Sequence, residues 1–219
     1  MRLRKKGWAK LELEKEPKVI FSSLDHKGQW KELFGNSDPI HLELGCGRGR
    51  FINQLAFTNT NINYIALDVY DELLVHVLRR ANENQLNNIR VIPINIKNIG
   101  DLFEQDEIEK IYINFCTPWP KKKHHKRRLT HPNFLRLYQT FLKEDAEIWF
   151  KTDDDLLFTD SLEYFKEAGF KELYRTYDLH QSDFQGNSIT EYEEKFSSQS
   201  IKIKFVRVRN SSNRARYHV

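Results

Sequence analysis

The sequence has few cysteines: Cys46 and Cys116 are the only two among 219 residues. Two cysteines are too few for a disulfide framework or a zinc cluster, so we expect no metal and a reducing compartment. Long apolar runs are also absent, since no window approaches the roughly 18 apolar residues that span a bilayer. The basic start, MRLRKKGWAK, is not followed by the apolar segment of a signal peptide. We therefore expect a cytoplasmic protein with no membrane partner.

The length of the chain allows a full hydrophobic core and does not require two domains. We predict a basic N-terminal arm over residues 1–35, a single domain over 36–210 and a basic C-terminal tail over 211–219. Nothing in the sequence decides between a monomer and a homodimer.

Acidic residues are missing from several segments, although the net charge is only +4. Lysine and arginine crowd the first ten residues, the run from Lys121 to Arg128 contains no acid, and no acid follows Glu194. Clustered Lys and Arg side chains displace the counterions around phosphates, so this segregation is typical of a polyanion-binding protein. Three unrelated solvated patches would give the same pattern.

Short apolar runs alternate with helical patterns along most of the chain. Strands are predicted at PIHLEL (39–44), NYIALD (63–68), IRVIPI (89–94), KIYINF (110–115), AEIWFK (146–151), FKELYRTYDL (170–179) and IKIKFVRVR (201–209). Helical spacing between the early strands, as in DELLVHVLRRANENQ, indicates βαβ units and a mainly parallel sheet with helices on both faces. The last two strands have no evident helix between them, which predicts an antiparallel hairpin at one edge of a seven-stranded α/β sheet.

The segment HLELGCGRGRF follows the first predicted strand and leads into a helical pattern. Gly45, Gly47 and Gly49 allow a tight turn and a close approach to a ligand. The spacing G-x-G-x-G differs from that of dinucleotide sites, and Glu43 favours a ligand with an ammonium group over a pyrophosphate. Asp68 ends the next strand, where an acid accepts hydrogen bonds from a ribose diol. A glycine loop alone would equally fit a tight turn without a ligand.

Taken together, these features resemble the S-adenosylmethionine site of class I methyltransferases. The resemblance implies a Rossmann-like fold and S-adenosylmethionine as the cofactor. It also places Asn95, at the end of the third predicted strand, near the adenine of the donor. A turn residue at a strand end is an equally good interpretation of Asn95.

The fourth predicted strand runs into the turn Thr117, Pro118 and Trp119, and then into the basic run. Ligands of open α/β sheets bind beyond the carboxyl ends of the strands, so we expect this turn beside the methyl donor. Enzymes that methylate amino groups of nucleic acids place a polar residue, a proline and a base-stacking aromatic residue there. A stiff loop whose tryptophan covers the core would have the same sequence. The adjoining cations favour a nucleic acid as the acceptor.

Four segments, IHLELGCGRGRF, NFCTPWPKKKHHKRRL, FKTDDDLLF and GNSITEYEEKF, are together similar to the bacterial tRNA (guanine-N7)-methyltransferase family. The similarity extends from MRLRKKGWA to about residue 205. It implies transfer of a methyl group from S-adenosylmethionine to N7 of a guanine in the variable loop of tRNA, at nucleotide 46.

The resemblance also assigns roles to individual positions. The donor-binding positions are Glu43, Gly45, Gly47, Gly49, Asp68, Asn95 and Thr117. The substrate-binding positions are Lys121, Asp153, Thr190, Glu191, Tyr192 and Glu193, and the RNA-contacting positions are Lys123, His124, His125, Lys126, Arg127 and Arg128. The family usually has an aspartate where this chain has Thr117, and an aspartate is common at the position of Asn95.

The chemistry of guanine N7 decides which catalytic groups are expected. N7 has a free lone pair, so it attacks a methyl sulfonium without losing a proton, and no general base is obligatory. Positive charge develops on the ring, and nearby carboxylates stabilise it. We expect Asp153 and Glu193 to do so, with Thr117 in the third catalytic position. Asp153 or one of its two aspartate neighbours is also expected to cap the following helix, and Glu193 also fits a solvated loop acid.

Other functions remain open from the residues. Thr117 is compatible with an RNA-binding protein whose catalysis is weakened, or with a different acceptor base or atom. Cys116 would allow attack on a pyrimidine ring, but this needs an activating partner and a second cysteine to release the product. We expect His124 and His125 to be largely neutral at pH 7 and to contact RNA rather than act as bases.

Overall fold

The structure, a computed structural model, describes residues 7–21, 26–197 and 199–211, without the side chains of Glu191, Glu194 and Ser197. Of the predicted tail only Ser211 is described, and the first six residues of the predicted arm lie outside the described part as well.

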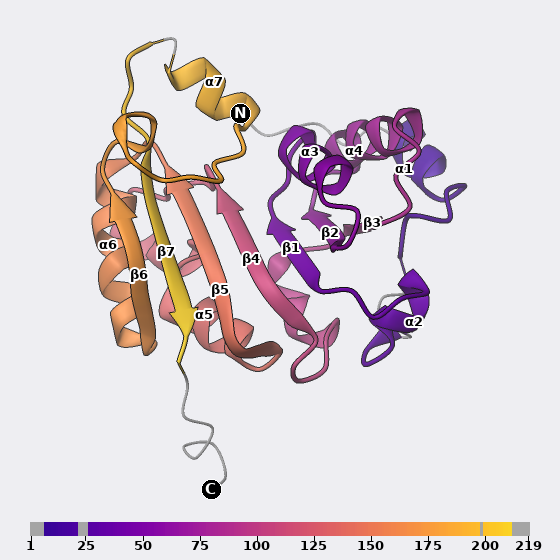
Figure 1. The fold of residues 1–219 in the computed structure, drawn as a ribbon, viewed down its shortest axis with the longest axis horizontal. Helices are drawn as coiled ribbons and strands as arrows, with labels where there is room; N and C mark the ends of the chain where they lie inside the picture. The colour runs from indigo at the N-terminus through magenta and orange to yellow at the C-terminus, as the bar shows by residue number, and fades with distance from the viewer. Residues whose placement is uncertain (1–6, 22–25, 198, 212–219) are drawn as a thin grey trace, which may run out of the picture.

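A seven-stranded sheet, in the order β3-β2-β1-β4-β5-β7-β6, runs through the molecule (Figure 1). Its strands are β1 Ile40–Leu44, β2 Asn63–Asp68, β3 Ile89–Pro93, β4 Ile108–Asn114, β5 Leu142–Thr152, β6 Phe170–Thr176 and β7 Lys204–Asn210. The strands β1 to β5 pair in parallel, whereas β7 pairs antiparallel with both β5 and β6. The predicted seven-stranded, mainly parallel α/β sheet is confirmed.

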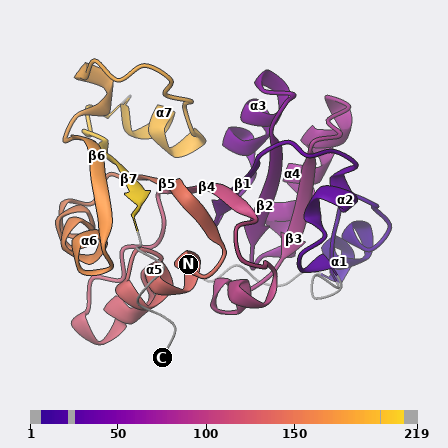
Figure 2. The ribbon, with the colours of Figure 1, turned by 60° about the horizontal axis from the view of Figure 1, so that its bottom comes forward.

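Helices cover both faces of this sheet. The α-helices are α1 Gly7–Leu13, α2 Trp30–Phe34, α3 Arg50–Thr58, α4 Asp71–Glu83, α5 Pro132–Gln139, α6 Asp155–Glu167 and α7 Glu191–Ser197. The 3-10 helices are η2 Ile96–Asp101, η3 Lys122–Arg127 and η4 Leu179–Gln181. Figure 2 shows α3 on one side of the sheet and α5 and α6 on the other.

The core is divided by the sheet because alternate side chains of each strand point to opposite faces. In β2, Ile65 and Leu67 join the cluster that includes α5 and α6, whereas Tyr64 and Ala66 join the cluster that includes α3 and α4. All six residues of β2 are buried, as expected for a strand covered on both faces. This arrangement leaves the carboxyl ends of the parallel strands as the edge where a ligand can bind.

The connection between β6 and β7 differs from the prediction. A simple hairpin without a helix was expected, but η4 and α7 lie between the two strands. The antiparallel pair of β6 and β7 does lie at one edge of the sheet, as predicted, with β7 between β5 and β6. The pattern of apolar residues did not predict α7, because this helix has only seven residues and its sequence, EYEEKFS, is mostly charged or polar.

The described part of residues 1–35 is built into the domain. Ala9 and Leu13 of α1 are fully buried in the cluster that includes α4, and Trp30 is fully buried and donates to the carbonyl of Leu102 at 2.8 Å. Val19 forms a bridge to Val91 of β3. The boundary predicted after residue 35 therefore does not coincide with a boundary in packing.

Within the described ranges, no helix combines the length and the apolar character needed to cross a membrane.

Candidate active site

A cleft of about 700 Å³ lies at the carboxyl ends of β1, β2 and β4. The residues predicted from the sequence that line it are Glu43, Gly45, Gly47, Gly49, Asp68, Asn95, Thr117, Trp119, Arg127, Thr190 and Tyr192. The predicted donor positions and part of the predicted acceptor positions therefore meet in one cleft.

The glycine loop forms one wall of this cleft. Gly49 precedes α3 with φ of +70°, and a Cβ there would lie 2.6 Å from a methyl group of Val77 in α4. Glycine is therefore the residue that allows α3 and α4 to pack closely at this point. The loop is also tied to β2, because the N–H of Gly45 donates to the carbonyl of Leu67 at 2.8 Å.

Asp68 anchors the loop from the end of β2. Its Oδ2 accepts from the N–H of Gly47 at 3.0 Å, and its Oδ1 accepts from the N–H groups of Val69 and Tyr70 at 2.7 and 3.0 Å. Burial raises the pKa of this carboxyl, against the effect of the backbone donors. The carboxylate still has capacity for a further donor, such as a hydroxyl in the cleft.

Glu43 is almost fully buried, with 3% of its surface exposed. Its Oε1 accepts from Nδ2 of Asn114 at 2.9 Å, whereas its buried Oε2 has no hydrogen-bond partner among the described residues. Burial raises the pKa of Glu43 to about 8, and the bond from Asn114 opposes this increase. A buried acceptor without a partner is costly, so a cationic donor in the cleft would be stabilised here. The site thus fits an ammonium-bearing ligand.

Asn95 is the turn residue that the sequence suggested, while its contact with the adenine of the donor stays a prediction. Its side chain accepts from the N–H of Lys97 at 3.1 Å and caps η2, and the residue also lines the cleft.

The turn after β4 forms the opposite wall. Phe115 and Trp119, at its two ends, have φ of +49° and +44°, which is unfavourable for side chains of this size. The ring of Trp119 lies 5.0 Å from the guanidinium carbon of Arg127 and 5.8 Å from the ring of His124. Strained backbone at a cleft wall is typical of functional sites.

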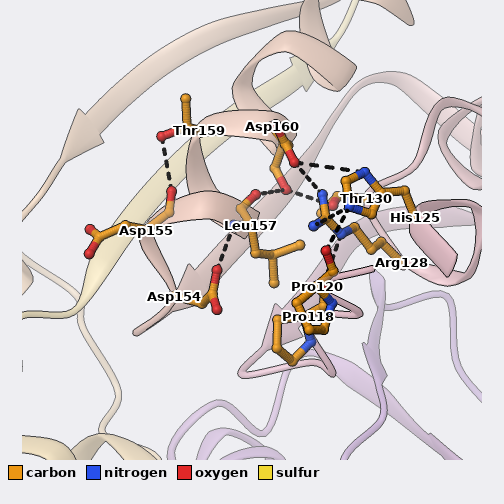
Figure 3. A network of polar contacts seen from close by, with 11 residues as sticks. Pro118, Pro120, His125, Arg128, Thr130, Asp154, Asp155, Leu157, Thr159 and Asp160 are labelled. Atoms are coloured by element: carbon orange, nitrogen blue, oxygen red, sulfur yellow. Dashed lines mark hydrogen bonds and ion pairs between the residues drawn. The ribbon is translucent and has the colours of Figure 1, made fainter. Parts of the chain in front are cut away.

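Arg128 holds this turn in place (Figure 3). Only 1% of the residue is exposed; its Nε donates to the carbonyl of Pro118 at 2.7 Å, and its Nη1 donates to Oδ2 of Asp160 in α6 at 2.5 Å. Nη2 lies 3.0 Å from Nε2 of His125. The prediction that Arg128 contacts RNA is corrected, because its guanidinium is buried against the protein. The other Lys and Arg side chains of residues 121–127 are exposed.

Glu193, predicted to act on the acceptor directly, does not line the cleft. It is fully buried, and its Oε2 lies 3.0 Å from Nζ of Lys151, which is also buried. Burial lowers the pKa of Lys151, and the charge of Glu193 opposes this decrease. In this arrangement the carboxylate faces a lysine, so its direct action on the acceptor stays a prediction.

Asp153 also lies outside the lining of the cleft. Its carbonyl accepts from Nζ of Lys204 at 2.8 Å. Its neighbour Asp154 caps α6, because its Oδ1 accepts from the N–H of Leu157 at 2.7 Å. The expectation that one of the three aspartates is the N-cap is confirmed.

The comparison with known proteins agrees with this geometry. A family model described as "Putative methyltransferase" matches residues 37–206. The tRNA (guanine-N(7)-)-methyltransferase of Desulfitobacterium hafniense (strain Y51) is 62% identical over 205 residues, which are 94% of this chain and 95% of that protein. The chain belongs to the tRNA (guanine-N(7)-)-methyltransferase family. Its relative of that name in Clostridium tetani is 57% identical and covers 94% of this chain and 98% of its own length.

Solved structures place this tRNA (guanine-N(7)-)-methyltransferase family member in a wider fold class. An antibiotic-related methyltransferase has a TM-score of 0.61 at 20% identity and covers 88% of this chain and 96% of its own. The 16S rRNA methyltransferase KamB has a TM-score of 0.61 at 14% identity, with 87% and 94% covered. The Rossmann-like class I methyltransferase fold and the family expected from the sequence are confirmed.

Cys116 lines the cleft of this family member, and burial raises the pKa of its thiol to about 12. A thiolate is therefore disfavoured at neutral pH, which weighs against the alternative of nucleophilic attack on a pyrimidine ring. Among the described residues, no group of three or more His, Cys, Asp and Glu side chains is placed to hold a metal ion.

Sequence reasoning missed several residues of the site: Asn114, Lys151, Asp160 and Asn187. One signal was present, because Thr190-x-x-Glu193 matches the capping box that starts a helix. The N–H of Glu193 donates to Oγ1 of Thr190 at 3.0 Å, and the N–H of Thr190 donates back to Oε2 of Glu193 at 3.3 Å. The side chain of Glu191, a predicted substrate contact, lies outside the described part.

Proposed function

We propose that this chain transfers the methyl group of S-adenosylmethionine to N7 of a guanine in the variable loop of tRNA. The observation that carries the proposal is the buried, unpartnered Oε2 of Glu43 in a cleft that also contains the turn from Thr117 to Trp119. The high identity to tRNA (guanine-N(7)-)-methyltransferases supports the choice of acceptor.

The donor side of the cleft fits S-adenosylmethionine. Glu43 would accept from its ammonium group, Asp68 from a ribose hydroxyl, and the backbone of the glycine loop would lie against it. Asn95 lines the same cleft as Asp68 and is the residue expected beside the adenine. When bound, this cofactor supplies an electrophilic methyl group on a sulfonium.

The acceptor side is formed by Trp119, Thr190 and Tyr192, which line the same cleft as Thr117. The tryptophan ring offers a surface on which a guanine base can stack. Because N7 carries a free lone pair, no side chain has to remove a proton from it. The role of these residues is to orient N7 toward the methyl group and to exclude water, which accounts for much of the rate of such a transfer. Asp153 remains a proposed substrate contact on the strength of its place at the end of β5.

Binding of the tRNA backbone is assigned to the exposed basic residues that adjoin the cleft: Lys121, Lys123, Lys126 and Arg127, with His124 and His125 beside them. These side chains directly follow the turn in sequence. The tRNA held by these cations would therefore also reach the methyl donor in the cleft. In this arrangement Arg128 supports the segment from within.

The experiment is an incubation of the purified protein with labelled S-adenosylmethionine and an unmodified tRNA that carries a guanine in its variable loop. The methylated nucleoside is then identified by mass spectrometry. We expect 7-methylguanosine, and none with a matched tRNA in which that guanine is replaced by adenine. Tight binding of tRNA and donor without transfer would favour an RNA-binding protein with weakened catalysis. A different methylated nucleoside would move the assignment to another acceptor.

A further inference from the structure

We infer that Lys151 is a positioning residue for the acceptor side of the cleft, because it holds Glu193 and the start of α7 so that Thr190 and Tyr192 form the wall. This inference rests on the proposed function. It assigns a role to a residue on β5 that does not line the cleft itself.

Lys151 lies near the carboxyl end of β5 and has only 2% of its surface exposed. Its Nζ donates to Oδ1 of Asn187 at 2.5 Å, to the carbonyl of Ser188 at 2.8 Å and to Oε2 of Glu193 at 3.0 Å. The ammonium thus uses all of its N–H donors within the protein. Lys151 therefore links β5 to Asn187 and Ser188, in the segment before α7, and to Glu193 in α7 itself.

Glu193 is the other centre of this network. Its Oε1 accepts from Nδ2 of Asn187 at 2.6 Å and lies 3.3 Å from Nε2 of His180. Its Oε2 also accepts from the N–H of Thr190, whose hydroxyl caps the N–H of Glu193 in return. One carboxylate therefore both starts the helix and fixes it to β5.

The helix depends on such contacts for its position. An isolated helix of seven residues is not stable in water, so tertiary contacts must hold α7 in place. Besides the network, the ring of Tyr192 stacks on that of Phe115 with centroids 6.0 Å apart, and Phe196 lies 5.7 Å from the same ring. Figure 1 shows α7 beyond the carboxyl ends of β4 and β5. The helix α7 is thus held at its N-terminal end by the ion pair of Glu193 with Lys151, and along its length by aromatic packing on Phe115.

Loss of the ammonium would remove the lysine cation from the buried carboxylate of Glu193, which would keep His180 at 3.3 Å from its Oε1. Such a carboxylate is strongly unfavourable, so the start of α7 would move until the carboxylate reaches water. Thr190 would move with it, because it belongs to the same capping box. A displacement of about 1 Å in an oriented reactant costs about 100-fold in rate.

The test is the substitution Lys151→Met, which keeps an unbranched side chain that is one atom shorter and removes the charge. We expect amide hydrogen exchange in residues 190–197 to become at least about 10-fold faster, and kcat for 7-methylguanosine formation to fall about 100-fold. The dissociation constant for S-adenosylmethionine should change much less than kcat, by no more than about 10-fold, although the charge of Lys151 also acts on Glu43. The matched control is Lys143→Met, on the same strand but paired with Glu109. It should change neither exchange in α7 nor kcat.

Two results with Lys151→Met would overturn the inference: unchanged exchange in α7, or faster exchange with unchanged kcat. The double variant Lys151→Met with Glu193→Gln removes both buried charges. If the single variant does not fold, the double variant is compared with the unmodified protein, and positioning then predicts protection of α7 and a kcat within about 10-fold of the unmodified values. Positioning predicts that the double variant recovers protection of α7 and a higher kcat than Lys151→Met. A direct contact of Glu193 with guanine predicts a kcat no higher than that of the single variant, which would contradict us.

Failure of the proposed function would be seen separately. In that case the unmodified protein would form no 7-methylguanosine, while the exchange measurement would still report whether Lys151 holds α7.

Discussion

Arg128 and Asp160 form an ion pair of 2.5 Å that ties the turn after β4 to α6 (Figure 3). The same guanidinium donates to the carbonyl of Pro118, so a charge on a helix outside the cleft fixes the backbone of the cleft wall. Residues of the basic run 121–128 therefore differ in role: its other Lys and Arg side chains are exposed to solvent, whereas that of Arg128 is buried in the protein.

Replacing Asp160 with alanine should lower the free energy of unfolding by about 2 kcal/mol, because the buried guanidinium of Arg128 loses its carboxylate. Urea unfolding measures this change. The control is Glu167→Ala on the same helix, where the pair with Arg136 is about half exposed on both sides and should contribute less than about 1 kcal/mol. Equal losses in the two variants would show that the Arg128 pair is an ordinary surface interaction.

Glu43→Gln should stabilise the ligand-free protein increasingly between pH 5 and pH 8. The pKa of Glu43 is about 8 in the folded state, above its ordinary value of 4.5, so the folded state retains a proton that the unfolded state has released. The stability of the unmodified protein therefore falls by at most about 1.4 kcal/mol for each step of one in pH through this window, and it levels off above the folded-state pKa. The glutamine lacks this dependence. Thermal unfolding at several pH values tests the sign.

The same variant should bind S-adenosylmethionine about 10- to 100-fold more weakly, since an amide cannot replace the charge opposite an ammonium. Calorimetry with the purified variant measures this loss. A variant that is more stable at pH 8 yet binds the donor as tightly as before would remove Glu43 from the donor site.

Neutralising Lys123, Lys126 and Arg127 together should weaken tRNA binding and reduce its salt dependence. Each lost phosphate contact lowers the slope of log K against log salt by about 0.7 to 0.9, so the slope for the triple variant should be smaller by about 2. Binding measured between low and physiological salt tests this. Arg128 stays unchanged, because its replacement would disturb the turn. An unaltered slope would place the RNA elsewhere on the surface.

Thr117→Asp should change kcat by less than about 10-fold, because methyl transfer to N7 needs no general base. Single-turnover methylation of the unmodified tRNA gives the rate. A rise well beyond that range would mean that threonine at this position weakens catalysis, and would favour the interpretation of the chain as a compromised enzyme.

The donor side of the cleft was predictable because its residues lie in short motifs. Glu43 and Gly45 belong to one strand and its following loop, and Asp68 ends the next strand, so ordinary βαβ geometry brings them together. The support of the acceptor side was not predictable in this way. Lys151 and Glu193 are 42 positions apart, and their pairing follows from burial and compensation of charge, which no local pattern reveals.

The burial of the predicted N-terminal arm was likewise not predictable from a local sequence pattern. Ala9 and Leu13 are spaced as one face of a helix, but the surrounding Lys and Glu residues conceal the apolar positions. Only the packing of α1 on α4 shows that this face is buried.

The position of β7 has a consequence for the order in which the chain folds. Because β7 lies between β5 and β6, the strand β6 has no partner in the sheet until β7 has been synthesised and inserted. During synthesis this half of the sheet therefore closes last, because β7 is the last strand to be made. The helix α7, on the acceptor side of the cleft, lies in the connection between β6 and β7. A nascent chain would therefore complete the donor side of the cleft well before it could bind an RNA.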